Sequence, residues 1–224
     1  TVTLHLRLSI FVLLQRFTAK AERQAFAMGT IWIICEATGQ ERHMTHPKLL
    51  GISGALRRAS TNRKLMHEAV RLFGDCDFTE ASLHLPLYDG DLEQAEGIPA
   101  SVQTLADQIA AADAVVISGP EYNKMISGVL KNALDWVSRV PGGVWKDKPV
   151  ALMCAAGGRA GGETSYHTMR HAMAPFRAHL IAGPAILVAG SQNEFDDAGH
   201  LKSEFYAKAV TELMTQLRAA IKPA

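Results

Sequence analysis

The sequence predicts a three-layer α/β fold, in which helices cover both faces of one parallel sheet. From about residue 44 onward, short apolar runs typical of strands alternate with amphipathic segments typical of helices. The run Ala114 to Ser118 is continuously hydrophobic, which indicates a strand buried on both faces, as in parallel sheets. With 224 residues, 48% of them hydrophobic, the chain is long enough for one substantial core.

The predicted elements follow one another in a regular order. Strands are expected at Lys48–Ile52, Phe78–Leu83, Ala114–Ser118, Val150–Cys154 and Ala185–Ala189. Helices are expected after Ser60, over Ser101–Ala112, Gly128–Val137 and Thr164–Phe176, and at the end of the chain, where the helical spacing joins Phe205, Ala209, Leu213 and Leu217. The segment from Pro86 to Pro99 is expected to be a loop.

The first part of the chain does not share this pattern. Leu4 to Leu14 is apolar, but Arg7 interrupts it, and the run is shorter than the ~20 residues that a membrane span requires. The interruption also disfavours a secretory signal, which needs an unbroken apolar run. We therefore expect residues 1–43 to be an extension, either disordered or foreign to the domain, and residues 44–224 to form a single domain.

Charge and cysteine content exclude some classes of protein. The formal net charge is only +1, so the chain lacks the strong positive field that attracts nucleic acid or an acidic membrane surface, and neither is expected as a partner. The three cysteines form no C-x-x-C pair, which favours a reducing compartment, and we expect a cytoplasmic protein. His167 and His171 lie one helical turn apart, but no third ligand is evident, so no metal site is expected.

If the strand order is 2-1-3-4-5, the loops after the first, third and fourth strands converge at one edge of the sheet. The first, Gly54 to Asn62, precedes a helix N-terminus and is a candidate phosphate site, in which Arg57 would neutralise the dianion. An ordinary capped helix with solvated arginines is the alternative. The candidate phosphate-side residues are Gly54, Ala55, Arg57, Ser60, Thr61 and Asn62.

The second and third loops are candidates for contact with a flat heterocycle such as a flavin. In Gly119 to Ser127, main-chain donors and an aromatic ring come from Pro120, Glu121, Tyr122 and Asn123. A Pro-rich turn with a half-buried tyrosine is the alternative. In Ala155 to Gly162, the candidate residues are Ala156, Gly157 and Gly158. Glycine lets the backbone approach a ring closely, and a simple flexible turn is the alternative.

Taken together, these residues resemble the NADPH-dependent FMN reductase family, which has a flavodoxin-like fold and includes chromate-reducing and quinone-reducing members. The resemblance covers about residues 46–220. The family's G-S-x-R-x-x-S-x-N loop is matched from Gly54 to Asn62, with Ala55 in place of the serine. Its P-E-Y-N block and its L-K-N-A-x-D-W helix are both present, at Pro120–Asn123 and Leu130–Trp136. Lys124 to Ser127 departs from the pattern, because relatives commonly carry smaller residues and a proline there.

The resemblance implies an NAD(P)H-dependent, FMN-containing oxidoreductase with a parallel five-stranded sheet of order 2-1-3-4-5. By resemblance, FMN takes a hydride from NADPH or NADH, and electrons then pass by a ping-pong route to a small-molecule acceptor such as a quinone, free FMN, chromate or an azo compound. No catalytic side chain is required. Members are generally homodimers or homotetramers. The alternative is a non-catalytic, flavodoxin-like electron carrier, against which the absence of a strongly acidic composition argues.

Overall fold

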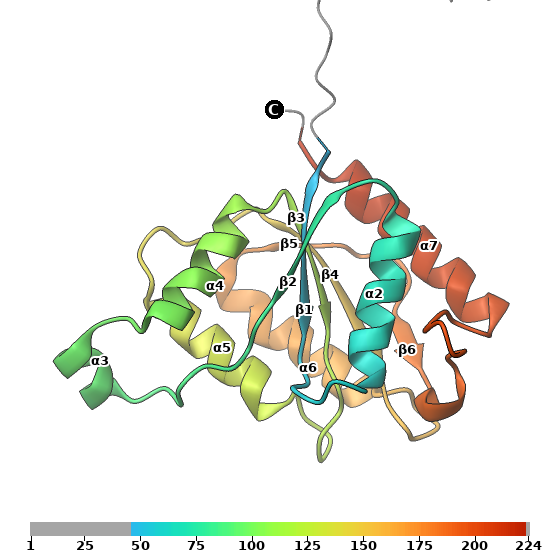
Figure 1. Ribbon diagram of the computed structural model, residues 1–224, viewed down its shortest axis with the longest axis horizontal. Coiled ribbons are helices and arrows are strands. Elements are labelled where there is room, and N and C mark those ends of the chain that lie inside the picture. Colours follow the sequence, from blue (N-terminus) through green and yellow to red (C-terminus); the bar gives the residue numbers. More distant parts are fainter. Residues whose placement is uncertain (1–45, 223–224) are drawn as a thin grey trace, which may run out of the picture. The chain divides into compact units, whose positions relative to one another are not determined.

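The computed structural model describes residues 46–222, so the predicted extension, residues 1–43, lies outside the described residues. The described part is a three-layer α/β structure around one parallel sheet (Figure 1). The strand order is β2-β1-β3-β4-β5, and a further strand, β6, also pairs with β4. The predicted fold class and strand order are therefore confirmed. The strands are β1 (Lys48–Ser53), β2 (Asp77–Ala81), β3 (Ala114–Ser118), β4 (Pro149–Ala155), β5 (His179–Leu180) and β6 (Ile186–Val188).

Two hydrophobic layers hold the helices on the sheet. Every residue of β3 and β4 is buried, as the continuous apolar run of β3 predicts for a central parallel strand. One face is covered by α4 (Ala100–Ala111), α5 (Gly128–Arg139) and α6 (Glu163–Met173). The other face is covered by α2 (Thr61–Phe73) and α7 (Glu204–Ala219). None of the helices in the described range is both long and apolar enough to cross a membrane.

The fifth position of the sheet differs from the prediction of one strand over Ala185–Ala189. It is occupied by two short strands, of which β5 pairs with Pro149 and Val150 and β6 pairs with Met153 to Ala155. Gly183 and Pro184 lie between them. Proline has no N–H for the ladder and glycine weakens a strand, so pairing is interrupted there.

The expected loop from Pro86 to Pro99 contains a helix, α3 (Gly90–Glu96), in which the Asp89 side chain caps the backbone N–H of Asp91. The chain leading to α3 is held against α5, because the Trp136 indole N–H donates a 2.8 Å hydrogen bond to the carbonyl oxygen of Pro86. The indole is fully buried, so Trp136 belongs to the core of the domain.

The buried stripe of α7 also differs from the predicted one. Phe205 is 75% exposed, whereas Leu213 and Leu217 are buried beside Val210 and Met214. In an α-helix, each step of four residues turns about 40° beyond a full revolution, so three such steps place Phe205 roughly 120° away from Leu217. A series of i+4 steps therefore drifts off the face that it starts on.

Candidate functional site

The carboxyl ends of the strands form one continuous edge, at which the three predicted loops meet. The backbone N–H of Gly54, just after β1, donates to the Ser118 carbonyl at the end of β3, at 2.9 Å. Gly119 donates in turn to Met153 of β4, at 3.0 Å. The Ser127 hydroxyl, which caps α5, also reaches the Gly54 carbonyl, at 2.5 Å. The first two loops are thus held together by direct hydrogen bonds at the lower end of the sheet in Figure 1.

The side chain of Asn62 connects the strand ends at this edge. This side chain, 2% exposed, accepts hydrogen bonds from the Ser118 hydroxyl (3.0 Å) and the Ala155 N–H (2.9 Å). Its amide group donates to the Ala155 carbonyl at 2.8 Å. The first turn of α2 is therefore tied to the ends of β3 and β4. Asn62 is a candidate phosphate ligand by sequence, and in the structure its side chain contacts the strand ends, a role that only the three-dimensional structure reveals.

The first loop has the properties of an anion site. Ser60 caps α2, since its hydroxyl accepts from the Asn62 N–H at 3.2 Å. Within the described range, the backbone N–H groups of residues 56–59 and of Thr61 donate no hydrogen bond, and Arg57 is exposed beside them. Free N–H groups, a helix N-terminus and a guanidinium together fit a phosphate. These residues can hold a phosphate group.

The second loop is a tight hairpin that presents two exposed side chains. Tyr122 and Met125 exchange backbone hydrogen bonds of 3.0 and 3.1 Å, and their side chains are 53% and 54% exposed. The two residues between them, Asn123 and Lys124, have φ values of 50° and 67°. Positive φ at both central positions is the pattern of a type I′ turn, in which glycine is common at the second position. Lys124 takes that position here, so the departure noted in the sequence leaves a tight turn in place.

Glu121 links the second loop to α6. One carboxylate oxygen accepts from the backbone N–H of Ser165 at 3.2 Å, and the other accepts from the Lys124 ammonium at 3.1 Å. Burial on its own would raise the pKa of Glu121, but the hydrogen bonds from Lys124 and from the α6 backbone outweigh it and lower that pKa. Gly162, the N-cap residue of α6, has no side chain that could cap the helix, so Glu121 serves as its cap.

The third loop is shaped by glycines of two kinds. Gly161 and Gly162 have φ values of 62° and 85°, and a Cβ on Gly161 would overlap the carbonyl group of Leu187. These two glycines are needed for the local packing. Gly158, in contrast, is exposed and has no atom within 4 Å of a Cβ placed on it, so its backbone is open to a ligand. Arg159 is also exposed.

The order of the parallel sheet, with loops that meet at its carboxyl edge, defines a flavodoxin-like protein. Residues 47–193 match the NADPH-dependent FMN reductase family, and the chain belongs to this family. It is 37% identical to an NAD(P)H-dependent FMN reductase of Pseudomonas aeruginosa, over 77% of this chain and 92% of that protein. It is 33% identical to an NADPH:quinone oxidoreductase of Arabidopsis thaliana, over 77% of this chain and 90% of that one.

A solved structure supports the same relationship. The flavoenzyme NAD(P)H:acceptor oxidoreductase FerB of Paracoccus denitrificans superposes with a TM-score of 0.71 and 28% identity, covering 78% of this chain and 97% of FerB. Family membership confirms the predicted class, an oxidoreductase enzyme that uses FMN and NAD(P)H. The thirteen predicted cofactor-binding residues are not tested individually by these relationships and stay a prediction.

Proposed function

We propose that this protein is an NAD(P)H-dependent FMN oxidoreductase that passes electrons to quinones or similar acceptors by a ping-pong route. The observation that carries the proposal is the hydrogen-bonded edge on which Gly54 is bonded to Ser118 at the end of β3, and Gly119 is bonded to Met153 of β4. These bonds bring a turn with free backbone N–H groups and a loop with an exposed aromatic ring to neighbouring strand ends. Relatives named as quinone oxidoreductases support the acceptor class.

Each loop has a distinct part in the proposal. The turn at Arg57 binds the phosphate of the cofactor, with Gly54, Ala55, Ser60 and Thr61 around it, and Asn62 positions that turn through its bonds to the strands. The loop at Pro120–Asn123 supplies backbone donors to the isoalloxazine edge and packs Tyr122 against the crevice. Ala156, Gly157 and Gly158 form the remaining wall. When bound, FMN supplies the hydride and electron transfer between NAD(P)H and the acceptor.

A ping-pong route is proposed because the two substrates use the same crevice. The nicotinamide must leave before the acceptor takes its place. Arg159, exposed at the third loop, is proposed to contact a phosphate of the nicotinamide nucleotide. An unchanged Michaelis constant for NADPH in Arg159→Ala would remove that assignment. For the assembly, we propose a homodimer or homotetramer, which light scattering of the purified protein measures directly.

The central experiment is anaerobic mixing of the FMN-loaded protein with NADPH, followed at the flavin absorbance. Rapid bleaching is expected, followed by full recovery when a benzoquinone is added. In steady-state kinetics with varied NADPH and quinone, parallel lines in double-reciprocal plots of the rate are expected for the ping-pong route. A flavin that NADPH leaves oxidised, yet that a separate reductase reduces, would instead identify a non-catalytic carrier. Repeating the assay with NADH, chromate and an azo dye measures the preference for donor and acceptor.

A further inference from the structure

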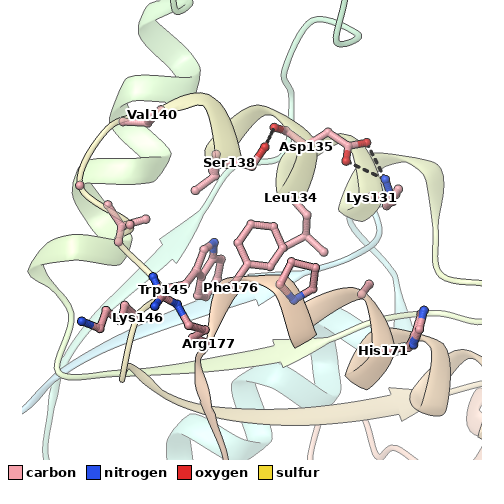
Figure 2. A pocket seen from close by; sticks show the side chains of 16 residues that line it. Lys131, Leu134, Asp135, Ser138, Val140, Trp145, Lys146, His171, Phe176 and Arg177 are labelled. Carbon is pink, nitrogen blue, oxygen red and sulfur yellow. Dashed lines mark hydrogen bonds and ion pairs between the residues drawn. The ribbon is translucent and has the colours of Figure 1, made fainter.

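A cavity of about 710 Å³ lies between α5 and the end of α6, apart from the three loops (Figure 2). Its lining comes from α5, from the turn before β4, and from the 3₁₀ turn Ala174–Phe176 that follows α6. Trp145 precedes β4 and Arg177 precedes β5, so this part of the lining is at the amino ends of the strands. None of the predicted cofactor residues lines the cavity.

The cavity has an apolar floor with two aromatic rings. Trp145, 3% exposed, and Phe176 lie with ring centres 6.3 Å apart at an angle of 60°, and Leu134 of α5 also lines the cavity (Figure 2). Rings arranged edge to face, with aliphatic side chains around them, favour a flat apolar ligand. The volume is in the range of roughly 300–1,000 Å³ that holds small organic ligands.

The Trp145 indole N–H lacks a hydrogen-bond partner. Among residues 46–222, Trp145 Nε1 is the one buried side-chain nitrogen or oxygen for which the structure provides no partner. The other tryptophan of this range, Trp136, donates to a backbone carbonyl at 2.8 Å. A buried donor without an acceptor is unfavourable, so an oxygen atom brought in by a ligand would stabilise the structure at this point.

One end of the cavity carries two cations without an ion pair among residues 46–222. Lys131 is paired with Asp135 at 2.6 and 2.8 Å, and this carboxylate is therefore occupied. Lys146 and Arg177 form no ion pair with any residue of the described part of the chain. The backbone beneath them is fixed, because Asp147 donates to the Arg177 carbonyl at 3.0 Å. Two unpaired cations at one end of an apolar cavity favour a ligand with an anionic group.

We propose that this cavity binds a small aromatic carboxylate or sulfonate. The aromatic body lies against Trp145 and Phe176, the acid group faces Lys146 and Arg177, and an oxygen accepts the Trp145 indole N–H. The indole nitrogen is buried, so the side chain turns slightly as the ligand enters. The site is separate from the flavin-binding edge, and the proposal does not depend on the function proposed above.

The test uses 2-naphthoate as the probe and the full FMN-loaded chain, with ¹⁵N-labelled tryptophan. Saturable binding is expected by calorimetry, together with a downfield shift of the Trp145 indole resonance, which is identified by its loss in Trp145→Phe. In the double variant Lys146→Gln/Arg177→Gln, affinity is expected to fall about tenfold or more. Trp145→Phe keeps the ring and removes the donor, so a loss of about threefold to tenfold is expected. Lys208→Gln, an exposed change on α7, is the matched control and leaves the affinity unchanged.

The indole spectrum of each variant shows whether it is folded before binding is measured. Equal affinity of 2-naphthoate for the wild type and the folded double variant would overturn the proposal. Equal binding of neutral 2-naphthalenemethanol, or an indole shift at Trp136 in place of Trp145, would also overturn it. Failure of the probe to bind would overturn it as well. If the Trp145 N–H is then protected from exchange only at high protein concentration, a second copy of the chain covers the cavity instead.

Discussion

The Asn62 side chain and the Ser118 hydroxyl, 56 residues apart in the sequence, are joined by a hydrogen bond of 3.0 Å beneath the proposed flavin-binding edge. The same amide holds both backbone groups of Ala155. One side chain therefore fixes the separation between the end of β3, the end of β4 and the first turn of α2. The proposed phosphate turn precedes that helical turn directly, so the clamp also sets its position.

Asn62→Ala is expected to lower the free energy of unfolding by about 3 kcal/mol, because buried polar groups of Ser118 and Ala155 lose their partner. For a domain of this size, this corresponds to a fall in Tm of roughly 6–12 °C. FMN retention should also weaken, since the phosphate turn loses its support. Thermal unfolding and flavin release on dilution measure the two effects. Asn193→Ala, at an exposed site, is the control, and an equal effect of both changes would contradict the clamp.

Arg57→Ala is expected to weaken FMN binding about tenfold or more, because a charge-assisted hydrogen bond contributes roughly 1.5–3 kcal/mol. Adding Ser60→Ala should weaken it further and should cost about 1 kcal/mol of stability through the lost helix cap. Equilibrium dialysis of the apoprotein with FMN gives the dissociation constant. Arg58→Ala, at the neighbouring exposed arginine, is the matched control. Full flavin occupancy in the double variant would refute the phosphate assignment.

Glu121→Gln is expected to destabilise the protein by about 1 kcal/mol at pH 7, because the N-terminus of α6 loses its anionic cap. The pKa of Glu121 is lowered in the folded protein, so its contribution is fully present above the ordinary glutamate pKa of about 4.3 and is lost as the pH falls through the lowered pKa. Urea unfolding of both proteins should therefore give a difference that disappears in acid. Glu163→Gln, the control, changes an exposed glutamate in the first turn of α6 and should have a smaller effect on stability. A difference that persists below that range would show that the charge is not its cause.

Gly161→Ala is expected to destabilise the protein by about 2–3 kcal/mol, through a strained positive φ and the overlap with the Leu187 carbonyl group. Gly158→Ala, three residues earlier, has open space around the new methyl group and should change stability by less than about 1 kcal/mol. Chemical denaturation of the two apoproteins compares them directly. Equal stability of the two variants would mean that the third loop rearranges freely around Gly161.

The sequence predicts the sheet well because its central strands are buried on both faces, as Ala114–Ser118 shows. Turn residues also gather after the first, third and fourth strands of the chain. One feature that it misses depends on long-range contacts. The two residues of β5 carry no periodicity of their own and are strand only through β4. α3 is missed for a different reason: it buries no residue, so no apolar stripe marks it, although Asp89 caps it locally.

The candidate site divides in the same way. The loops that meet at the edge follow from the strand order, which the resemblance to the FMN reductase family implies and the structure confirms. The contacts of Asn62 with Ala155 do not follow from the strand order. Ala155 lies 93 positions away, and local sequence patterns do not specify such a distant partner. A fully buried carboxylate, Glu68, was likewise not predicted; it is paired with Arg71 and holds the backbone of Leu201.

The interrupted fifth position of the sheet also bears on how copies of this chain can meet. Two strands of two and three residues, with Gly183 and Pro184 between them, present no long row of unpaired backbone groups on that side. A neighbouring sheet would find too few consecutive donors and acceptors to extend the ladder there, which protects against open-ended aggregation. Ordered self-association must then use helical or loop surfaces on this side of the molecule.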